Sequence, residues 1–149
     1  MSRANQYCYD HQRPAVTVDI VLFSLESGRI EVLLIKRARE PFRGLLALPG
    51  GFVEKDEALE RAAERELCEE TGLTGIHLEQ VGAFGDPGRD PRGHTVSIAY
   101  SAVIDDGWDN LKADSDAADA RWWHATRPPR LAFDHDKILR AAMGRMFGK

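Results

Sequence analysis

Residues 51–73 read GFVEKDEALERAAERELCEETGL, and the acidic side chains near the end of this stretch are unusual for a helix. The apolar spacing predicts a helix over residues 56–71, with Asp56 near its N-cap and Gly72 just beyond its last turn. Glu66 and Glu70 are four residues apart and would repel each other on that helix. They also lie near its C-terminus, where the helix dipole disfavours negative charge. Their position therefore needs a reason other than helix stability.

The glutamates of the last turns continue the apolar face of the predicted helix. Each follows an apolar residue by seven positions, which is two turns less about 20°: Glu66 follows Leu59, Glu69 follows Ala62, and Glu70 follows Ala63. We therefore expect all three carboxylates to face inward, where Arg65 supplies too little positive charge for them. A hard divalent cation with oxygen ligands, Mg²⁺ or Mn²⁺, would supply the rest.

The spacing of the whole stretch resembles a known family motif. Gly51, Glu57, Arg65-Glu66-Leu67, Glu69-Glu70 and Gly72-Leu73 match the Nudix box, G-x5-E-x7-R-E-U-x-E-E-x-G-U with U apolar, at every position. The resemblance implies an α/β fold, the Nudix-type α/β/α sandwich with a central mixed sheet. It also implies hydrolysis of a nucleoside diphosphate linked to another group, by water and a divalent cation.

Roles for individual residues follow from the same resemblance. Glu66 and Glu70 would be metal ligands, Glu69 a ligand or water activator, and Gly51 would offer its carbonyl oxygen. Glu57 and Arg65 would form an orienting ion pair, provided that the start of the helix is bent or looped. The general base remains open: Glu69 and Glu70 are candidates within the box, and Asp86 and Asp90 are candidates in the loop that follows it.

Outward from the box, the chain alternates strand-like and helix-like segments. Strands are predicted over residues 15–25, 30–35, 76–84, 95–104 and 120–123, from their β-branched and apolar residues. A short apolar piece at 45–48 ends at Pro49-Gly50-Gly51, which predicts a break, and Asp134 is expected to cap a C-terminal helix. A mixed sheet with a helix on either face is the simplest packing. We expect a flexible N-terminal arm over residues 1–13 and a single domain over residues 14–149.

Three further stretches are similar to the ADP-ribose pyrophosphatase branch of the family: GDPGRDPRGHTVSIAY at 85–100, LAFDH at 131–135 and RPAVTVDIVLF at 13–23. This similarity implies conversion of ADP-ribose to AMP and ribose 5-phosphate. The candidate substrate contacts are Arg37, Arg39, Arg89, Asp90, Arg92 and Phe133, since arginine suits phosphate recognition and an aromatic ring suits a base. The alternative for the arginines is an ordinary solvated surface, and for Phe133 a place in the core.

The amino-acid composition limits the classes of binding partner that we expect. The net charge is -4 with no basic tract, so no nucleic-acid partner is expected. No apolar run reaches the roughly 20 residues that span a bilayer, and two cysteines form no disulfide framework, which favours the cytoplasm. Family resemblance implies a homodimer.

Two other functions remain open at this point. One is a house-cleaning nucleoside triphosphate pyrophosphatase, and the other is a non-catalytic sensor of ADP-ribose or related NAD metabolites. Such sensors often lose acids of the box, whereas all are present in this chain, so an enzyme is expected.

Overall fold

The computed structural model describes residues 6–105 and 120–148. Its strands are β1 (Ala15–Ser24), β2 (Glu31–Lys36), β3 (Leu46–Ala47), β4 (Gly50–Phe52), β5 (Glu79–Phe84), β6 (Thr95–Ile104) and β7 (Ala120–His124), and its helices are α1 (Leu59–Thr71) and α2 (His135–Phe147). No helix in the described ranges has the length and apolar character needed to cross a bilayer.

The strands form one mixed sheet. Its main path runs β3-β2-β1-β6-β5, while β4 pairs with β1 and β7 pairs with β2. β1 and β6 are parallel along their whole length, from Ala15 opposite Thr95 to Ser24 opposite Ile104. The other pairings are antiparallel. β1 is therefore the central strand on which the other elements are assembled.

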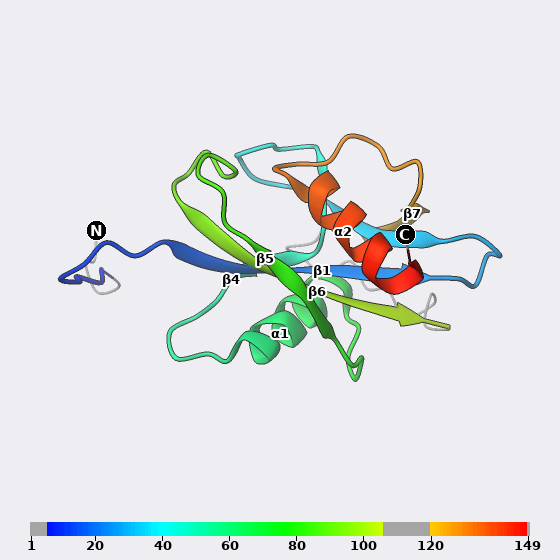
Figure 1. The fold of residues 1–149 in the computed structure, drawn as a ribbon, viewed down its shortest axis with the longest axis horizontal. Helices are drawn as coiled ribbons and strands as arrows, with labels where there is room; N and C mark the ends of the chain where they lie inside the picture. The colour runs from blue at the N-terminus through cyan, green and yellow to red at the C-terminus, as the bar shows by residue number, and fades with distance from the viewer. Residues whose placement is uncertain (1–5, 106–119, 149) are drawn as a thin grey trace.

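The two helices cover opposite faces of this sheet (Figure 1). Alternate side chains of β1 point to opposite faces because the strand period is two residues. Val18, Ile20 and Leu22 pack in the cluster that contains Ala62, Ala63 and Leu67 of α1. Val21 and Phe23 pack in the cluster that contains Ile138, Leu139 and Ala142 of α2. The predicted α/β/α sandwich with a central mixed sheet is confirmed.

α1 begins later than the sequence predicts, whereas α2 begins directly after Asp134, as expected. α1 begins at Leu59 rather than Asp56, because Asp56 has a φ of 59° and lies in the turn before the helix. Asp134 precedes α2 but makes no side-chain cap. Its carboxylate instead accepts two hydrogen bonds from Arg89. The expected cap at Asp56 was therefore wrong, whereas Asp134 occupies the N-cap position of α2 without a side-chain hydrogen bond to the helix.

The break predicted at Pro49-Gly50-Gly51 contains a strand. β4 runs antiparallel to β1, with Gly51 opposite Val18 and Gly50 opposite Asp19. A Cβ atom on Gly50 would lie only 2.1 Å from the Val18 carbonyl oxygen, so glycine permits this close pairing. The pairing brings Gly51 beside the end of α1.

Candidate active site

The three glutamates of α1 differ in exposure. Glu70 is buried, and the side chain of Glu66 is only 12% exposed, whereas that of Glu69 is 55% exposed. The buried stripe near the end of the helix passes through Ala63, Leu67 and Glu70. The prediction that all three acids face inward was wrong for Glu69, because Leu67 occupies the core position on that turn.

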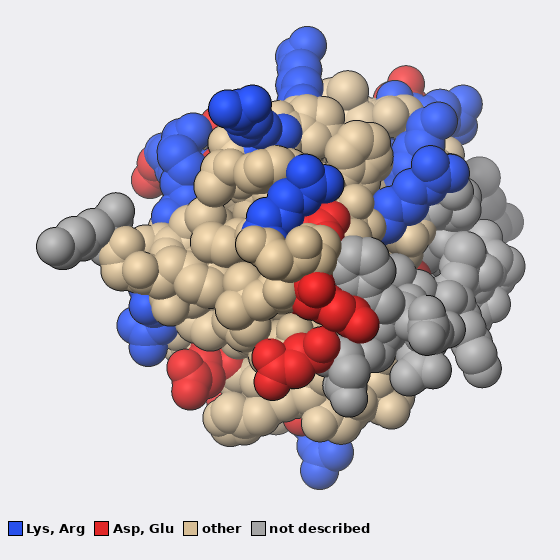
Figure 2. Space-filling model, turned by 90° about the vertical axis from the view of Figure 1, so that its right-hand side faces the viewer, with Lys and Arg blue, Asp and Glu red and all other residues tan. Residues whose placement is uncertain are grey.

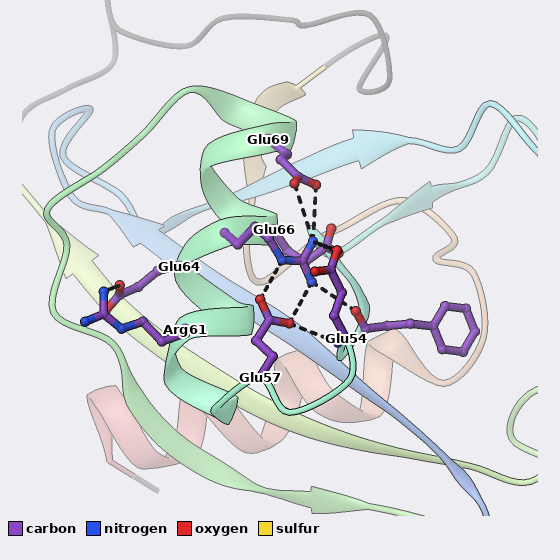
Figure 3. A network of polar contacts seen from close by, with 8 residues as sticks. Glu54, Glu57, Arg61, Glu64, Glu66 and Glu69 are labelled. Atoms are coloured by element: carbon purple, nitrogen blue, oxygen red, sulfur yellow. Dashed lines mark hydrogen bonds and ion pairs between the residues drawn. The ribbon is translucent and has the colours of Figure 1, made fainter. Parts of the chain in front are cut away.

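Arg65 holds several of the surrounding acids together (Figure 3). Its Nε donates to Glu57 Oε2 at 2.7 Å, and its Nη1 donates to Glu66 Oε1 at 2.9 Å and to Glu69 Oε2 at 3.4 Å. A further nitrogen donates to the Phe52 carbonyl oxygen at 3.1 Å. The Glu57–Arg65 pair expected from the box is present, because Glu57 lies in the turn before α1. The hydrogen bonds from Arg65 lower the pKa of Glu57 to about 2.

Among the glutamates at the end of α1, Glu70 is buried with few groups to stabilise its negative charge. Its Oε1 accepts a hydrogen bond from the Gly50 N–H at 3.1 Å, while its buried Oε2 has no hydrogen-bond partner among the described residues. Burial raises the pKa of Glu70 to about 8, and the nearby charge of Glu66 acts in the same direction. Burial also raises the pKa of Glu66. Two carboxyl groups are thus held close together with too little positive charge.

These residues fit a hard cation in part. Glu70 Oε2 has no hydrogen-bond partner among the described residues, and a Cβ on Gly51 would lie 2.4 Å from Glu66 Oε1, so only glycine lets this backbone approach the carboxylate. Within residues 6–105 and 120–148, no group of three or more His, Cys, Asp or Glu side chains is arranged to hold a metal ion. The carboxylate oxygens of Glu66 and Glu70 suit a cation that keeps several waters, as Mg²⁺ does.

A pocket of about 200 Å³ lies beside β4, and both arginine and aromatic side chains line it. The Arg37 guanidinium lies 4.9 Å from the centre of the Phe133 ring. Arg92 lies 4.9 Å from the Phe52 ring and 5.4 Å from the Phe133 ring. Burial, and after it the charge of Arg92, lowers the pKa of Arg37. Two cations therefore converge on one small pocket.

The loop between β5 and β6 is fixed by two ion pairs. Arg89 donates hydrogen bonds to both carboxylate oxygens of Asp134, at 3.0 and 2.6 Å. The Arg92 side chain donates to both carboxylate oxygens of Asp90, and its shortest hydrogen bond, to Oδ2, is 2.8 Å. Of the two candidate bases in this loop, Asp90 is buried by its pair. Asp86 is exposed and lies 3.7 Å from Lys137. The structure places Arg89, Asp90 and Arg92 along the pocket, but with their charged groups already paired.

The sequence did not predict that Asp19 and His135 meet in the lining of this pocket. Asp19, the lone acid in the apolar run of β1, is buried and accepts a hydrogen bond from the Ser97 hydroxyl on β6. His135 Nε2 lies 3.4 Å from Asp19 Oδ1, and the side chains of both residues are at least nine-tenths buried. The signal was available, since a carboxylate in the middle of a buried strand requires a partner.

A second hollow, of about 390 Å³, lies over the acids of α1 and is lined by Lys36, Arg39, Glu66, Glu69 and Glu70 among others. It shares Ile35, Arg37 and Gly50 with the smaller pocket, so the two spaces adjoin. On the face shown in Figure 2, acidic side chains are grouped together with Lys and Arg side chains around them. The arrangement places a group of carboxylates beside several arginines.

Comparison with known proteins agrees with this geometry. The NUDIX domain family matches residues 13–142. An ADP-ribose pyrophosphatase from Methanocaldococcus jannaschii is 45% identical over 130 residues, covering 87% of this chain and 73% of that protein. The ADPR responsive transcriptional repressor NtrR from Acinetobacter baylyi is 38% identical over 148 residues, which are 94% of this chain but 57% of the repressor.

A solved structure of a NUDIX domain also resembles this chain. The NUDIX domain of Shewanella oneidensis NrtR, in its cocrystal structure with ADP ribose, superposes with a TM-score of 0.83 at 32% identity, covering 98% of this chain and 99% of that one.

Proposed function

Because this chain belongs to the Nudix hydrolase family, we propose that it hydrolyses the pyrophosphate bond of a nucleoside diphosphate derivative, ADP-ribose first, with a divalent cation. The products are AMP and ribose 5-phosphate, with one water consumed. The observation that carries the proposal is the pair of adjoining hollows, one lined by acids and one by arginines, which share Arg37 and Gly50. A diphosphate with a group at each end suits such a site.

The acids of α1 serve the reacting phosphates in this proposal. A divalent cation held by Glu66, Glu70 and the Gly51 carbonyl would neutralise pyrophosphate oxygens and lower the pKa of a bound water. Arg65 orients Glu66 and Glu69 through the hydrogen bonds described above. The proton of the attacking water goes to a carboxylate of the box, Glu69 or the unpartnered Oε2 of Glu70.

The arginines serve the rest of the substrate. Arg37 and Arg39 line the acid-rich hollow and contact phosphate oxygens, since guanidinium groups match phosphate geometry. Arg92 and Phe133 line the smaller pocket and contact one end of the molecule, while Arg89 and Asp90 hold the loop in place. At about 200 Å³ this pocket takes one ring rather than the whole substrate.

The proposal also covers the cation and the assembly. Mg²⁺ is the proposed ion and Mn²⁺ a substitute, because the donors of the site are oxygen atoms. The proposed assembly is a homodimer. Activity titrated with each ion and light scattering of the purified protein test these two points.

A substrate panel tests the activity itself. Purified protein is incubated with ADP-ribose, NADH, dinucleoside polyphosphates and 8-oxo-dGTP, each with Mg²⁺ and with Mn²⁺, and the products are separated by chromatography. We expect ADP-ribose to be among the best substrates and to give AMP and ribose 5-phosphate. Faster release of pyrophosphate from the triphosphate would support the house-cleaning alternative and contradict the proposal.

A sensor of ADP-ribose is the second candidate, and the similarity to the ADPR responsive repressor favours it. Calorimetry of ADP-ribose binding, run beside the turnover assay, separates the two. Binding without turnover of any nucleotide would support the sensor. Turnover that is lost in Glu70→Gln while ligand binding remains would support the enzyme.

A further inference from the structure

We propose that His135 is a positioning residue for the cation site, because its ring fixes the segment from Leu48 to Gly51 relative to Glu66 and Glu70. This inference deepens the proposed function, since it rests on the same cation site. It assigns a role to a buried histidine that contacts none of the box acids.

Both nitrogens of the His135 ring are engaged. Nδ1 accepts a hydrogen bond from the Leu48 N–H at 3.0 Å, so the neutral ring carries its proton on Nε2. Nε2 faces Asp19 Oδ1 at 3.4 Å, and Asp19 is itself held by the Ser97 hydroxyl. Burial lowers the pKa of His135, which favours this neutral form. The ring is therefore fixed in orientation by groups on β1, on β6 and beside β4.

The segment that His135 holds has few donors of its own. Pro49 has no N–H, so the amides of Leu48 and Gly50 are consecutive donors. Leu48 donates to His135 on α2, and Gly50 donates to Glu70 Oε1 on α1 at 3.1 Å. The Pro49 carbonyl oxygen accepts from the Ile20 N–H at 2.8 Å. This short segment thus links helices on opposite faces of the sheet.

The consequence appears at the next residue. Gly51 lies so close to Glu66 that a Cβ would be 2.4 Å from its carboxylate oxygen. A small displacement of the segment therefore changes the distance between the Gly51 backbone and both acids. Releasing the Leu48 amide leaves a buried donor without an acceptor, and the segment has to move to satisfy it.

The test measures Mn²⁺ binding to metal-free protein by electron paramagnetic resonance, without nucleotide. His135→Phe keeps a ring and removes both nitrogens, and we expect the Mn²⁺ dissociation constant to rise by about 10–100-fold, as for residues that orient metal ligands. His135→Asn offers an amide oxygen to the Leu48 N–H, and we expect Mn²⁺ binding close to wild type. Ile138→Val, also in the buried face of α2, is the matched control for a loss of packing.

The outcomes separate three roles for His135. Weak Mn²⁺ binding in His135→Phe, restored in His135→Asn and unaffected in Ile138→Val, supports the proposal. A raised KM with unchanged Mn²⁺ binding would mean that His135 contacts substrate, and an equal melting temperature loss in both helix variants with unchanged Mn²⁺ binding would mean packing alone. Either result overturns the proposal, as would a wild type that binds no Mn²⁺.

Two further arms keep the test decisive. If His135→Phe does not fold, His135→Gln replaces it, because its amide reaches the Nε2 position and leaves the Leu48 amide free; weak Mn²⁺ binding is again expected. If wild type binds Mn²⁺ but turns over no nucleotide in the panel, the proposed activity fails. The Mn²⁺ comparison then still decides the role of His135.

Discussion

Two polar clusters lie near β4, and they differ in charge balance. The glutamate cluster, on and before α1, places Glu54, Glu57, Glu66 and Glu69 around Arg65, with Glu70 next to Glu66. The loop pairs match one acid to one arginine, Arg89 with Asp134 and Arg92 with Asp90. The excess of acid in the first cluster marks where a cation is needed. The balanced pairs hold a loop in place and leave little charge for chemistry.

The largest effect is expected at the most strained acid of the glutamate cluster. Glu70→Gln keeps the shape of the side chain and removes a buried carboxyl group whose Oε2 has no partner among the described residues. We expect kcat with ADP-ribose to fall by about 10³-fold, since both a cation ligand and a candidate base are lost. The melting temperature should stay the same or rise. A large fall in stability, measured by thermal denaturation without metal, would contradict the charge imbalance.

The raised pKa of Glu70 predicts how the stability of the protein depends on pH. The pKa of Glu70 is raised to about 8 in the folded protein, above the unfolded value near 4.3, so the folded state binds the proton more tightly. In buffer with EDTA, the melting temperature should therefore fall as the pH rises from about 4.5 to 8. Saturating Mn²⁺ should reverse the fall, and Glu70→Gln should flatten it. An identical pH profile in wild type and Glu70→Gln would contradict the assignment.

The next effect is expected at Arg65. Arg65→Lys keeps the charge but loses the fork that contacts Glu57 through two nitrogens, at 2.7 and 3.0 Å. We expect activity to fall by about 10–100-fold, since Arg65 orients acids of the site, and stability to fall by about 1–3 kcal/mol. Arg61→Lys is the matched control, because its side chain is 80% exposed and lies 4.0 Å from Glu64. Equal effects in both variants would show that Arg65 has no special role.

Substitutions in the loop pairs should affect substrate binding and protein stability more than turnover. Arg89→Lys breaks the two-bonded pair with Asp134, in which the Arg89 side chain is 5% exposed. We expect a stability loss of about 1–3 kcal/mol and a higher KM, with kcat nearly unchanged. Arg140→Lys, in an exposed pair with Asp136 on α2, is the control and should change neither. A fall in kcat at constant KM would move the loop pairs into the reaction.

The sequence predicted the acid-rich side of the site better than the arginine side. Charges placed against the helix dipole at Glu66 and Glu70 are visible in a single segment, and so is the motif around them. The exposure of Glu69 depends on how α1 sits on the sheet, which seven-residue spacing does not define. β4 was missed because its pairing uses backbone groups of glycines, which give no side-chain pattern. Asp19 and His135 meet only through the folded sheet.

The smallest effect is expected at Asp90, and it decides where the general base lies. Asp90 Oδ1 accepts from the Arg92 backbone N–H at 2.9 Å and from its Nε at 3.0 Å, and Oδ2 accepts from a terminal nitrogen at 2.8 Å. Although burial opposes it, these hydrogen bonds hold the pKa of Asp90 below its usual range. A carboxylate so engaged is a poor proton acceptor, so Asp90→Asn should reduce kcat by less than about tenfold. Removing a true general base costs about 10²–10⁴-fold. A loss of that size in Asp90→Asn would place the base in the loop rather than at Glu69 or Glu70.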